Sequence, residues 1–322
     1  MAELGRHLFF DNRLSGDWSR SCSSCHMPSR GWADGEALSR GYLGTQYFRN
    51  APGLVDAVFR KRFMWDGRLD GGDLPALVRD MVTEAHFMNA DGRLVQERLK
   101  QVPEYVRRWQ EIFGADADPY GPRMFSVVGE FLKTLVSRET PLDRYLRGEH
   151  NALSASENKG YALFNDKAGC VTCHNGPLAS DHQFHRLGVP EHPDVLGNPL
   201  RSISMLRHYA SFGMPNYMAA RTDIGLYAVT KDEADRGKFL TPGLRELKHT
   251  APYMHNGVFR RLEDVVEFYN RGGGKGSELK PLGLTADEKH ALIAFLLSMS
   301  GEPVRVAVPE QLDFQGRNLG DN

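Results

Sequence analysis

Apolar residues recur at helical spacing in several stretches of the chain, and these stretches predict its elements. They return at i, i+3 and i+4 rather than at every second position, which is the pattern of a helix with one buried face. Almost nothing alternates as a strand does, so the pattern predicts a mostly α fold. The helical stretches are residues 4–14, where the helix ends in a turn, and residues 74–83, 94–113 and 125–135.

Two capping boxes predict helix starts in the second half of the chain. They run from Ser154 to Glu157 and from Thr285 to Glu288, and in each the hydroxyl and the carboxylate can satisfy free backbone N–H groups. Residues 176–244, in contrast, are rich in Gly, Pro and His and show little periodicity. We therefore expect long loops there.

The length of 322 residues is enough for two domains of ordinary size. Residues 142–151 are polar and contain few apolar side chains, which is typical of a connection between domains. We therefore predict an N-terminal domain of residues 1–148 and a C-terminal domain of residues 149–322.

Charge and hydropathy limit the classes of partner. The formal net charge is −1 and the sequence pI is about 6.9, which gives no reason to expect nucleic acid or an anionic membrane as a partner. The longest apolar run, Ala291 to Leu297, is too short to span a bilayer. No secretory leader is recognisable before the first predicted helix.

Two short motifs of the form C-x-x-C-H carry the strongest chemical signal. Two thiols at this spacing can each form a thioether to one vinyl group of a haem, and the next imidazole can bind the iron. A zinc site would need the two motifs to converge, and a C-x-x-C redox pair does not require the following His. We therefore predict two covalently bound c-type haems. The motifs use all four cysteines: Cys22 and Cys25 with His26, and Cys170 and Cys173 with His174.

The two motifs lie in similar contexts. Each follows a predicted helix that carries Phe-Phe or Leu-Phe and then a short loop. This predicts an internal duplication, with two cytochrome c-like domains that hold one haem each. Because haem is attached to such motifs outside the cytoplasm, we expect a periplasmic protein whose leader has been removed.

Several further stretches match one protein family in their order along the chain. They are Leu4-Gly5-Arg6, Leu8-Phe9-Phe10-Asp11, Arg13-Leu14-Ser15, Arg49-Asn50-Ala51-Pro52, Trp65-Asp66-Gly67-Arg68, Gly237 to Arg245 and Thr250 to Gly257. Through them the chain resembles the bacterial di-haem cytochrome c peroxidase family, and within it the MauG-like branch (the MauG and MbnH type). The similarity runs from residue 4 to about residue 300.

The resemblance implies different roles for the two haems. The N-terminal haem, with His26 as proximal ligand, reacts with peroxide and needs an empty position on its other face. Many relatives block that position at rest with a His from the loop after the first motif, but residues 27–60 contain no His. The resemblance therefore implies an open site in the diferric state. The haem of His174 relays oxidising equivalents.

The sixth ligand of the second haem is Met in many relatives and Tyr in MauG. The matching segment, residues 265–273, offers Tyr269 and no Met. A phenolate is a hard anionic donor that favours Fe(III) and higher states, whereas a thioether raises the potential. The alternative is that Tyr269 is an ordinary half-buried aromatic on an amphipathic helix.

The resemblance also assigns residues between the haems. Trp65 matches a Trp that shortens the distance for electron hopping, and the alternative is a core Trp before an Asp-Gly turn. Asn50, Thr250 and Pro252 match the calcium ligands of the family, and oxygen donors suit Ca²⁺. This calcium site rests wholly on the resemblance.

One departure concerns the acid–base group that moves protons as the peroxide O–O bond breaks. The family places a carboxylate before a Met, and alignment on Met88 puts Phe87 at that position. Glu84 and His86 are the remaining acid–base candidates. The alternative for His86 is a surface histidine.

The leading interpretation is a periplasmic di-haem c oxidoreductase that uses hydrogen peroxide to form a high-valent state shared by both irons. It would then oxidise a partner protein, at an aromatic residue such as Trp, by long-range electron transfer. The alternative is a cytochrome c peroxidase that reduces hydrogen peroxide with electrons from a small donor cytochrome. A third hypothesis, of another class, is a di-haem electron carrier without catalysis.

Overall fold

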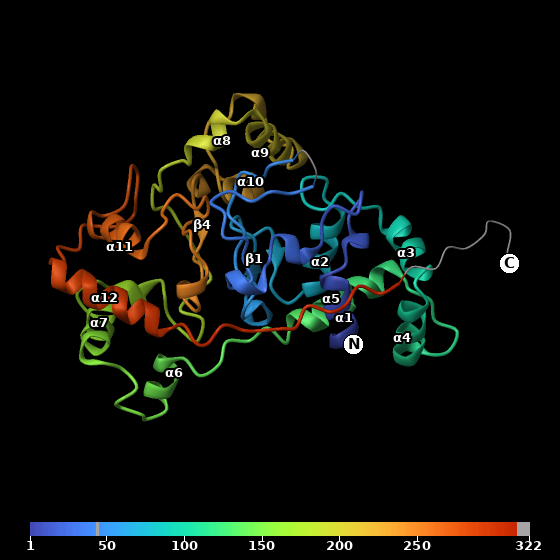
Figure 1. Ribbon diagram of the computed structural model, residues 1–322. Helices are drawn as coiled ribbons and strands as arrows, with labels where there is room; N and C mark the ends of the chain where they lie inside the picture. Colours follow the sequence, from blue (N-terminus) through green and yellow to red (C-terminus); the bar gives the residue numbers. More distant parts are fainter. Residues whose placement is uncertain (43–44, 314–322) are drawn as a thin grey trace.

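The structure is a computed structural model that describes residues 1–42 and 45–313. It is mostly helical, as predicted, and its strands form two short antiparallel ribbons (Figure 1). None of the helices in this part of the chain is long and apolar enough to cross a membrane. The helices are α1 (Ala2–Phe9), α2 (Leu74–Thr83), α3 (Gly92–Lys100), α4 (Pro103–Phe113), α5 (Gly121–Leu132), α6 (Pro141–Leu146), α7 (Ala155–Asn165), α8 (Pro193–Gly197), α9 (Pro199–Ser211), α10 (Tyr227–Thr230), α11 (Leu262–Asn270) and α12 (Ala286–Ser298). The strands are β1 (Arg62–Phe63) paired with β2 (Leu69–Asp70), and β3 (Phe184–His185) paired with β4 (Phe239–Leu240).

Most of the predicted helices are confirmed. α2 has the predicted bounds, and α5 begins at Gly121, before the predicted start. The predicted helix over 94–113 is divided into α3 and α4 at Pro103, because proline lacks the N–H that would continue a helix and is favoured in a first turn. Both capping boxes form as predicted, at the starts of α7 and α12.

The prediction that residues 176–244 consist of loops is wrong, because this region contains α8, α9 and α10. Helix α9 is 13 residues long. Its buried face combines Met205 and Tyr209 with the polar residues Arg201 and His208. Because half of this face is polar, its burial does not appear as an apolar period in the sequence.

The two halves of the chain repeat one helix packing, which makes the predicted duplication visible. α1 packs on α5 in the first half, and α7 packs on α12 in the second. Each contact includes a glycine without room for a side chain. A Cβ at Gly5 would lie 2.1 Å from the carbonyl oxygen of Val127, and one at Gly160 would lie 2.0 Å from that of Ala291.

Three hydrophobic cores hold these elements together. One lies in the first half around α1, α2 and α5, and another lies between α7 and α12. The third combines Tyr47 and Phe48 of the first half with Met205 and Tyr209 of α9. Helix α9 therefore lies against the first half of the chain (Figure 1).

The last described residues also return to the first half. Figure 1 shows this segment, in red, running from α12 toward α1 and α5. The indole N–H of Trp32 donates to the carbonyl oxygen of Val304 at 2.8 Å, and Arg13 donates to that of Leu312 at 2.7 Å. These contacts and those of α9 cross the boundary proposed at residue 148, and the division into two domains stays a prediction.

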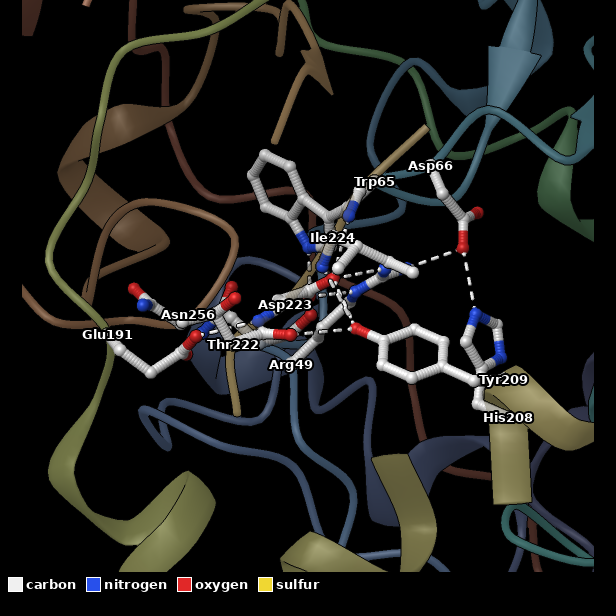
Figure 2. A network of polar contacts seen from close by, with 12 residues as sticks. Arg49, Trp65, Asp66, Glu191, His208, Tyr209, Thr222, Asp223, Ile224 and Asn256 are labelled. Atoms are coloured by element: carbon white, nitrogen blue, oxygen red, sulfur yellow. Dashed lines mark hydrogen bonds and ion pairs between the residues drawn. The ribbon is translucent and has the colours of Figure 1, made fainter. Parts of the chain in front are cut away.

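A buried ion network joins the two halves (Figure 2). Arg49 donates to Asp66 at 2.6 Å and, through two nitrogens, to Asp223 at 2.6 and 2.8 Å. All three side chains are almost wholly buried. The hydroxyl of Tyr209 donates to Asp223 at 3.2 Å, and Nε2 of His208 lies 3.2 Å from Asp66.

The charges of this network balance each other. Burial alone would raise the pKa of both carboxyls, but Arg49 outweighs it at Asp223, and Arg49 and Arg68 together outweigh it at Asp66. The pKa of Asp66 is therefore well below its ordinary value, and that of Asp223 is lowered. Buried ions are tolerated only when they are paired in this way.

The helix contact at Gly160 can be tested by substitution. Gly160→Ala is expected to lower the free energy of unfolding by about 1–3 kcal/mol, because the new methyl group meets the Ala291 carbonyl and Phe295. Urea unfolding of the holoprotein, followed by circular dichroism, measures this change. The control is Gly92→Ala in the first turn of α3, where nothing lies within 4 Å. Equal stability of the two variants would contradict the close contact.

Candidate functional site

Each C-x-x-C-H motif folds into a short 3-10 turn that is followed by its histidine. The backbone N–H of His26 donates to the carbonyl oxygen of Cys22 at 3.0 Å, and that of His174 donates to the carbonyl oxygen of Cys170 at 2.8 Å. The first and last residues of each motif are therefore held one turn apart. The two turns are η2 (Cys22–Ser24) and η5 (Cys170–Thr172).

The two imidazoles are fixed in the same way. Nδ1 of His26 lies 2.9 Å from the carbonyl oxygen of Trp32, and Nδ1 of His174 lies 3.0 Å from that of Ala179. Because a carbonyl only accepts, Nδ1 carries the proton and Nε2 keeps a free lone pair, which is how metal-bound histidines are commonly held. Burial lowers the pKa of both rings, that of His26 to about 4, so both are neutral.

None of the four cysteines is paired in a disulfide, so each motif keeps two sulfurs that can form thioethers to a haem. Among the described residues, the one group of three close metal-ligating side chains is Cys173, Asp181 and His185. It contains a residue of only one motif, so the described part of the chain holds no zinc site built from both motifs.

A cavity of about 920 Å³ lies beside the second motif. Its volume falls in the range of roughly 300–1,000 Å³ that ligand pockets occupy. Because a haem is a large and mostly apolar group, these residues fit one. The lining combines Cys170, Cys173 and His174 with Tyr269 and with the apolar side chains of Phe164, Val266, Leu292 and Leu296.

Tyr269 reaches this cavity from α11. Burial raises the pKa of Tyr269 well above its ordinary value. A phenolate at this place therefore needs a cation beside it. Met64 and Met254 line the same cavity, so thioether sulfur is also present there.

The other residues predicted between the haems lie on the wall of the same cavity. They are Trp65, Asn50, Thr250 and Pro252. The indole N–H of Trp65 donates to the main-chain carbonyl oxygen of Asn50 at 3.0 Å. The side-chain oxygen of Asn50 and the main-chain oxygens of Thr250 and Pro252 accept no hydrogen bond from any described residue. Three hard oxygen donors are therefore available at this wall.

The surroundings of the first motif contain His86. Sγ of Cys25 lies 3.2 Å from the carbonyl oxygen of Arg40, and a Cβ on the next residue, Gly41, would lie 1.9 Å from the carbonyl oxygen of His86. His86 is 4% exposed, and neither of its ring nitrogens has a hydrogen-bond partner among the described residues. Its ring stacks on Tyr47 with centroids 5.3 Å apart.

The burial of His86 excludes the alternative of a surface histidine. Burial, with smaller contributions from His208 and Arg68, lowers the pKa of His86 to about 3. Glu84, the other acid–base candidate, ends α2 with its side chain 50% exposed and one carboxylate oxygen 3.9 Å from Nδ1 of His86. Phe87 packs edge-on against His86 at 4.5 Å.

Sequence reasoning missed three residues of this neighbourhood, namely Tyr47, Arg68 and His208. Arg68 donates to both carboxylate oxygens of Asp66, at 3.0 and 2.9 Å. The stretch from Trp65 to Arg68 could have pointed to Arg68, since it places a cation close to an acid. No local pattern connects His86 with Tyr47 or His208, because these rings come together only through the tertiary packing.

Comparison with known proteins agrees with these sites. A family model described as di-haem cytochrome c peroxidase matches residues 1–151. The whole chain is 59% identical to the cytochrome-c peroxidase IdrP2 of Denitromonas iodatirespirans and covers 87% of it. It is 36% identical to the methylamine utilization protein MauG of Methylorubrum extorquens, over 95% of this chain and 80% of that protein.

Two solved structures share the fold. A MauG-like protein associated with microbial copper homeostasis aligns with a TM-score of 0.79 and 27% identity, over 93% of this chain and 89% of that chain. The diheme peroxidase BthA from Burkholderia thailandensis aligns with a TM-score of 0.73 and 23% identity, over 98% and 90% of the chains, and shows the common fold alone. The chain belongs to the di-haem cytochrome c peroxidase family and is a haem-dependent, peroxidase-type oxidoreductase with two haems c.

Proposed function

We propose that the protein reduces hydrogen peroxide at the haem of His26 and draws the electrons from a partner protein through the haem of His174. The observation that carries this proposal is an asymmetry. The two proximal histidines are held identically, but the phenol of Tyr269 lines the cavity beside the second motif, while an unpaired imidazole, His86, lies near the first motif.

The first site is suited to peroxide because no imidazole from the neighbouring loop is available to block it. Residues 27–60 contain no histidine. The haem held there supplies the redox chemistry when bound. The chain would hold it through a neutral His26 with a free Nε2, and the buried polar groups around His86 would move protons.

Trp65 is proposed as the step for electrons between the two sites. Trp65 lines the cavity beside the second motif, and the next residue, Asp66, contacts Arg68 and His208 near the first motif. Two consecutive residues therefore face the two centres. An aromatic ring at this place divides one long electron transfer into two shorter ones.

The electrons could come from either of two kinds of donor. The first is a small donor cytochrome, which is favoured by the name cytochrome-c peroxidase of the relatives at 59% and 45% identity. The second is an aromatic residue of a partner protein, such as Trp, which would be oxidised by long-range electron transfer. Tyr269 favours this donor, because a phenolate ligand stabilises the higher oxidation states of iron, and MauG is among the relatives.

A calcium ion is proposed beside Trp65. The unpaired oxygens of Asn50, Thr250 and Pro252 are hard donors, and waters can complete the six to eight positions that Ca²⁺ takes. We expect elemental analysis of the purified protein to find one calcium per chain, and Asn50→Ala to lower that content. An unchanged content in Asn50→Ala would exclude this residue as a ligand.

The proposed location is the periplasm. Support comes from the two motifs, because covalent attachment of haem to C-x-x-C-H takes place outside the cytoplasm.

The function can be tested with stoichiometric peroxide. One equivalent of hydrogen peroxide, mixed with the diferric protein without a reductant, is expected to change the absorbance of both haems. A near-infrared band is expected as the charge becomes shared between the two irons. Trp65→Phe should keep the change at the first haem and slow the change at the second. Trp109→Phe, at a core tryptophan that does not line the cavity, is the matched control.

The same experiment with excess peroxide and a reduced small cytochrome distinguishes a peroxidase fed by a donor cytochrome from an enzyme that oxidises a partner protein. Turnover in the usual range of about 1–10³ s⁻¹ would support the donor-fed peroxidase. Absorbance changes without turnover would favour oxidation of a partner protein. A diferric protein that ignores peroxide until it is half-reduced would contradict the proposed open site.

The ligand role of Tyr269 predicts a change of potential. Tyr269→Met is expected to raise the midpoint potential of the second haem by on the order of 100 mV, within the roughly 0.8 V over which axial ligands move haem potentials. Spectroelectrochemistry measures this shift. Tyr253→Phe, which keeps the ring and removes another hydroxyl of the cavity wall, is the control. An unchanged potential in Tyr269→Met would assign the sixth position to another donor.

A further inference from the structure

A group of buried polar atoms without partners lies near the first haem motif. Both ring nitrogens of His86 and the hydroxyl of Tyr47 are buried and have no hydrogen-bond partner among the described residues. The two rings are stacked, with an angle of 3° between their planes. Burying such groups unpaired costs free energy, so their retention indicates a polar ligand that completes them.

The group includes a fixed cation. The guanidinium of Arg68 is held by both oxygens of Asp66, and only 10% of its side chain is exposed. The charge of Arg68 influences both rings. Burial raises the pKa of Tyr47, and Arg68 opposes that rise. Burial lowers the pKa of His86, and Arg68 adds to that decrease. The positive charge of Arg68 therefore lies close enough to both rings to act on them.

The second half of the chain holds this arrangement in place. His208 of α9 lies edge-on to His86, with ring centroids 6.5 Å apart, and Nε2 of His208 lies 3.2 Å from Asp66. Asp66 also accepts from Arg49 at 2.6 Å. One carboxylate thus holds both Arg68 and His208.

We propose that His86, Tyr47 and Arg68 form the site that binds and cleaves peroxide, with His86 as the acid–base group and Arg68 and Tyr47 as stabilisers of the developing negative charge. This inference rests on the proposed function and deepens it. A mobile proton and a fixed cation would do together what a carboxylate does in relatives that have one at the position of Phe87.

The proton balance gives each group a task. Reduction of H₂O₂ to two waters needs two electrons, which the partner protein supplies through the haems, and two protons. His86 takes the proton from one peroxide oxygen and returns it to the other, so that the O–O bond breaks with water rather than hydroxide as the leaving group. Arg68 and Tyr47 lower the energy of the charge that appears during this transfer.

Glu84 connects His86 with solvent, so that protons can be exchanged there. Its carboxylate lies 3.9 Å from Nδ1 of His86, and half of its side chain is exposed. The inner nitrogen, Nε2, remains free for the ligand. The two acid–base candidates of the sequence therefore act in series, with Glu84 exchanging protons at the surface and His86 carrying them inward.

Two variants test this assignment in the holoprotein. His86→Gln is expected to slow the reaction of the diferric protein with peroxide by about 10²–10⁴-fold, the usual contribution of a general acid–base group. Tyr47→Phe keeps the stacked ring and removes only the hydroxyl, and a loss of roughly tenfold is expected. His150→Gln, at an exposed histidine on the link between the halves, is the control for removing an imidazole.

Cyanide binding provides a readout that does not depend on turnover. Hydrogen cyanide must lose its proton to bind ferric haem, so His86→Gln should slow its association by a factor similar to that for peroxide. Tyr47→Phe should speed its dissociation. Stopped-flow absorbance measures both rates, and unchanged circular dichroism shows that the variants fold.

The outcomes separate this inference from the proposed function. If the natural protein reacts with peroxide and both variants react equally fast, the site assignment is overturned and the proposed function stands. If His86→Gln reacts faster and turns a low-spin haem into a high-spin one, His86 is an iron ligand and the assignment is also overturned. If the natural protein itself ignores peroxide, the proposed function fails.

Discussion

The arrangement of both sites depends on one buried cation, Arg49, which lies between Asp66 of the first half and Asp223 of the second. A buried arginine between two carboxylates is stable only while all three are present, because each lost partner leaves a charge uncompensated, at a cost of about 3–5 kcal/mol. Asp66 directly follows Trp65, and Asp223 accepts from Tyr209 on α9. The network therefore fixes the position of the indole and of α9 at once (Figure 2).

The packing between the halves also makes the surroundings of the two repeated motifs different. Both halves contain the same turn, the same hydrogen bond to Nδ1 and the same glycine contact between helices. What differs is supplied from outside the repeated unit. Tyr269 of α11 lines the cavity beside the second motif, while His208 of α9 lies against His86 of the first half. Packing between the halves, rather than the motifs, distinguishes the two sites.

The sequence was sufficient for the features that are local. The two motifs, the capping boxes and the apolar period of α2 each depend on residues only a few positions apart, and all appear in the structure. The break at Pro103 was also a local signal, but the apolar period continued across it. The resemblance to a family added Tyr269 and Trp65, which the structure brings to one cavity.

The remaining features could not be predicted, because they depend on distant residues. α9 buries Arg201 and His208 together with Met205 and Tyr209, so its sequence lacks the continuous apolar stripe that would have predicted a helix. The contact of His86 with Tyr47 joins segments that share no pattern. The unpaired state of the His86 nitrogens is likewise visible only when the surrounding residues are in place.

The central claim is that the two haem centres differ, with an open first site and a phenol-ligated second site. Low-temperature electron paramagnetic resonance of the diferric protein, as purified, tests it most directly. The account predicts one high-spin ferric signal, from the haem of His26, and one low-spin signal, from the haem held by His174 and Tyr269. Two low-spin signals would mean that both irons are six-coordinate at rest, and would contradict it.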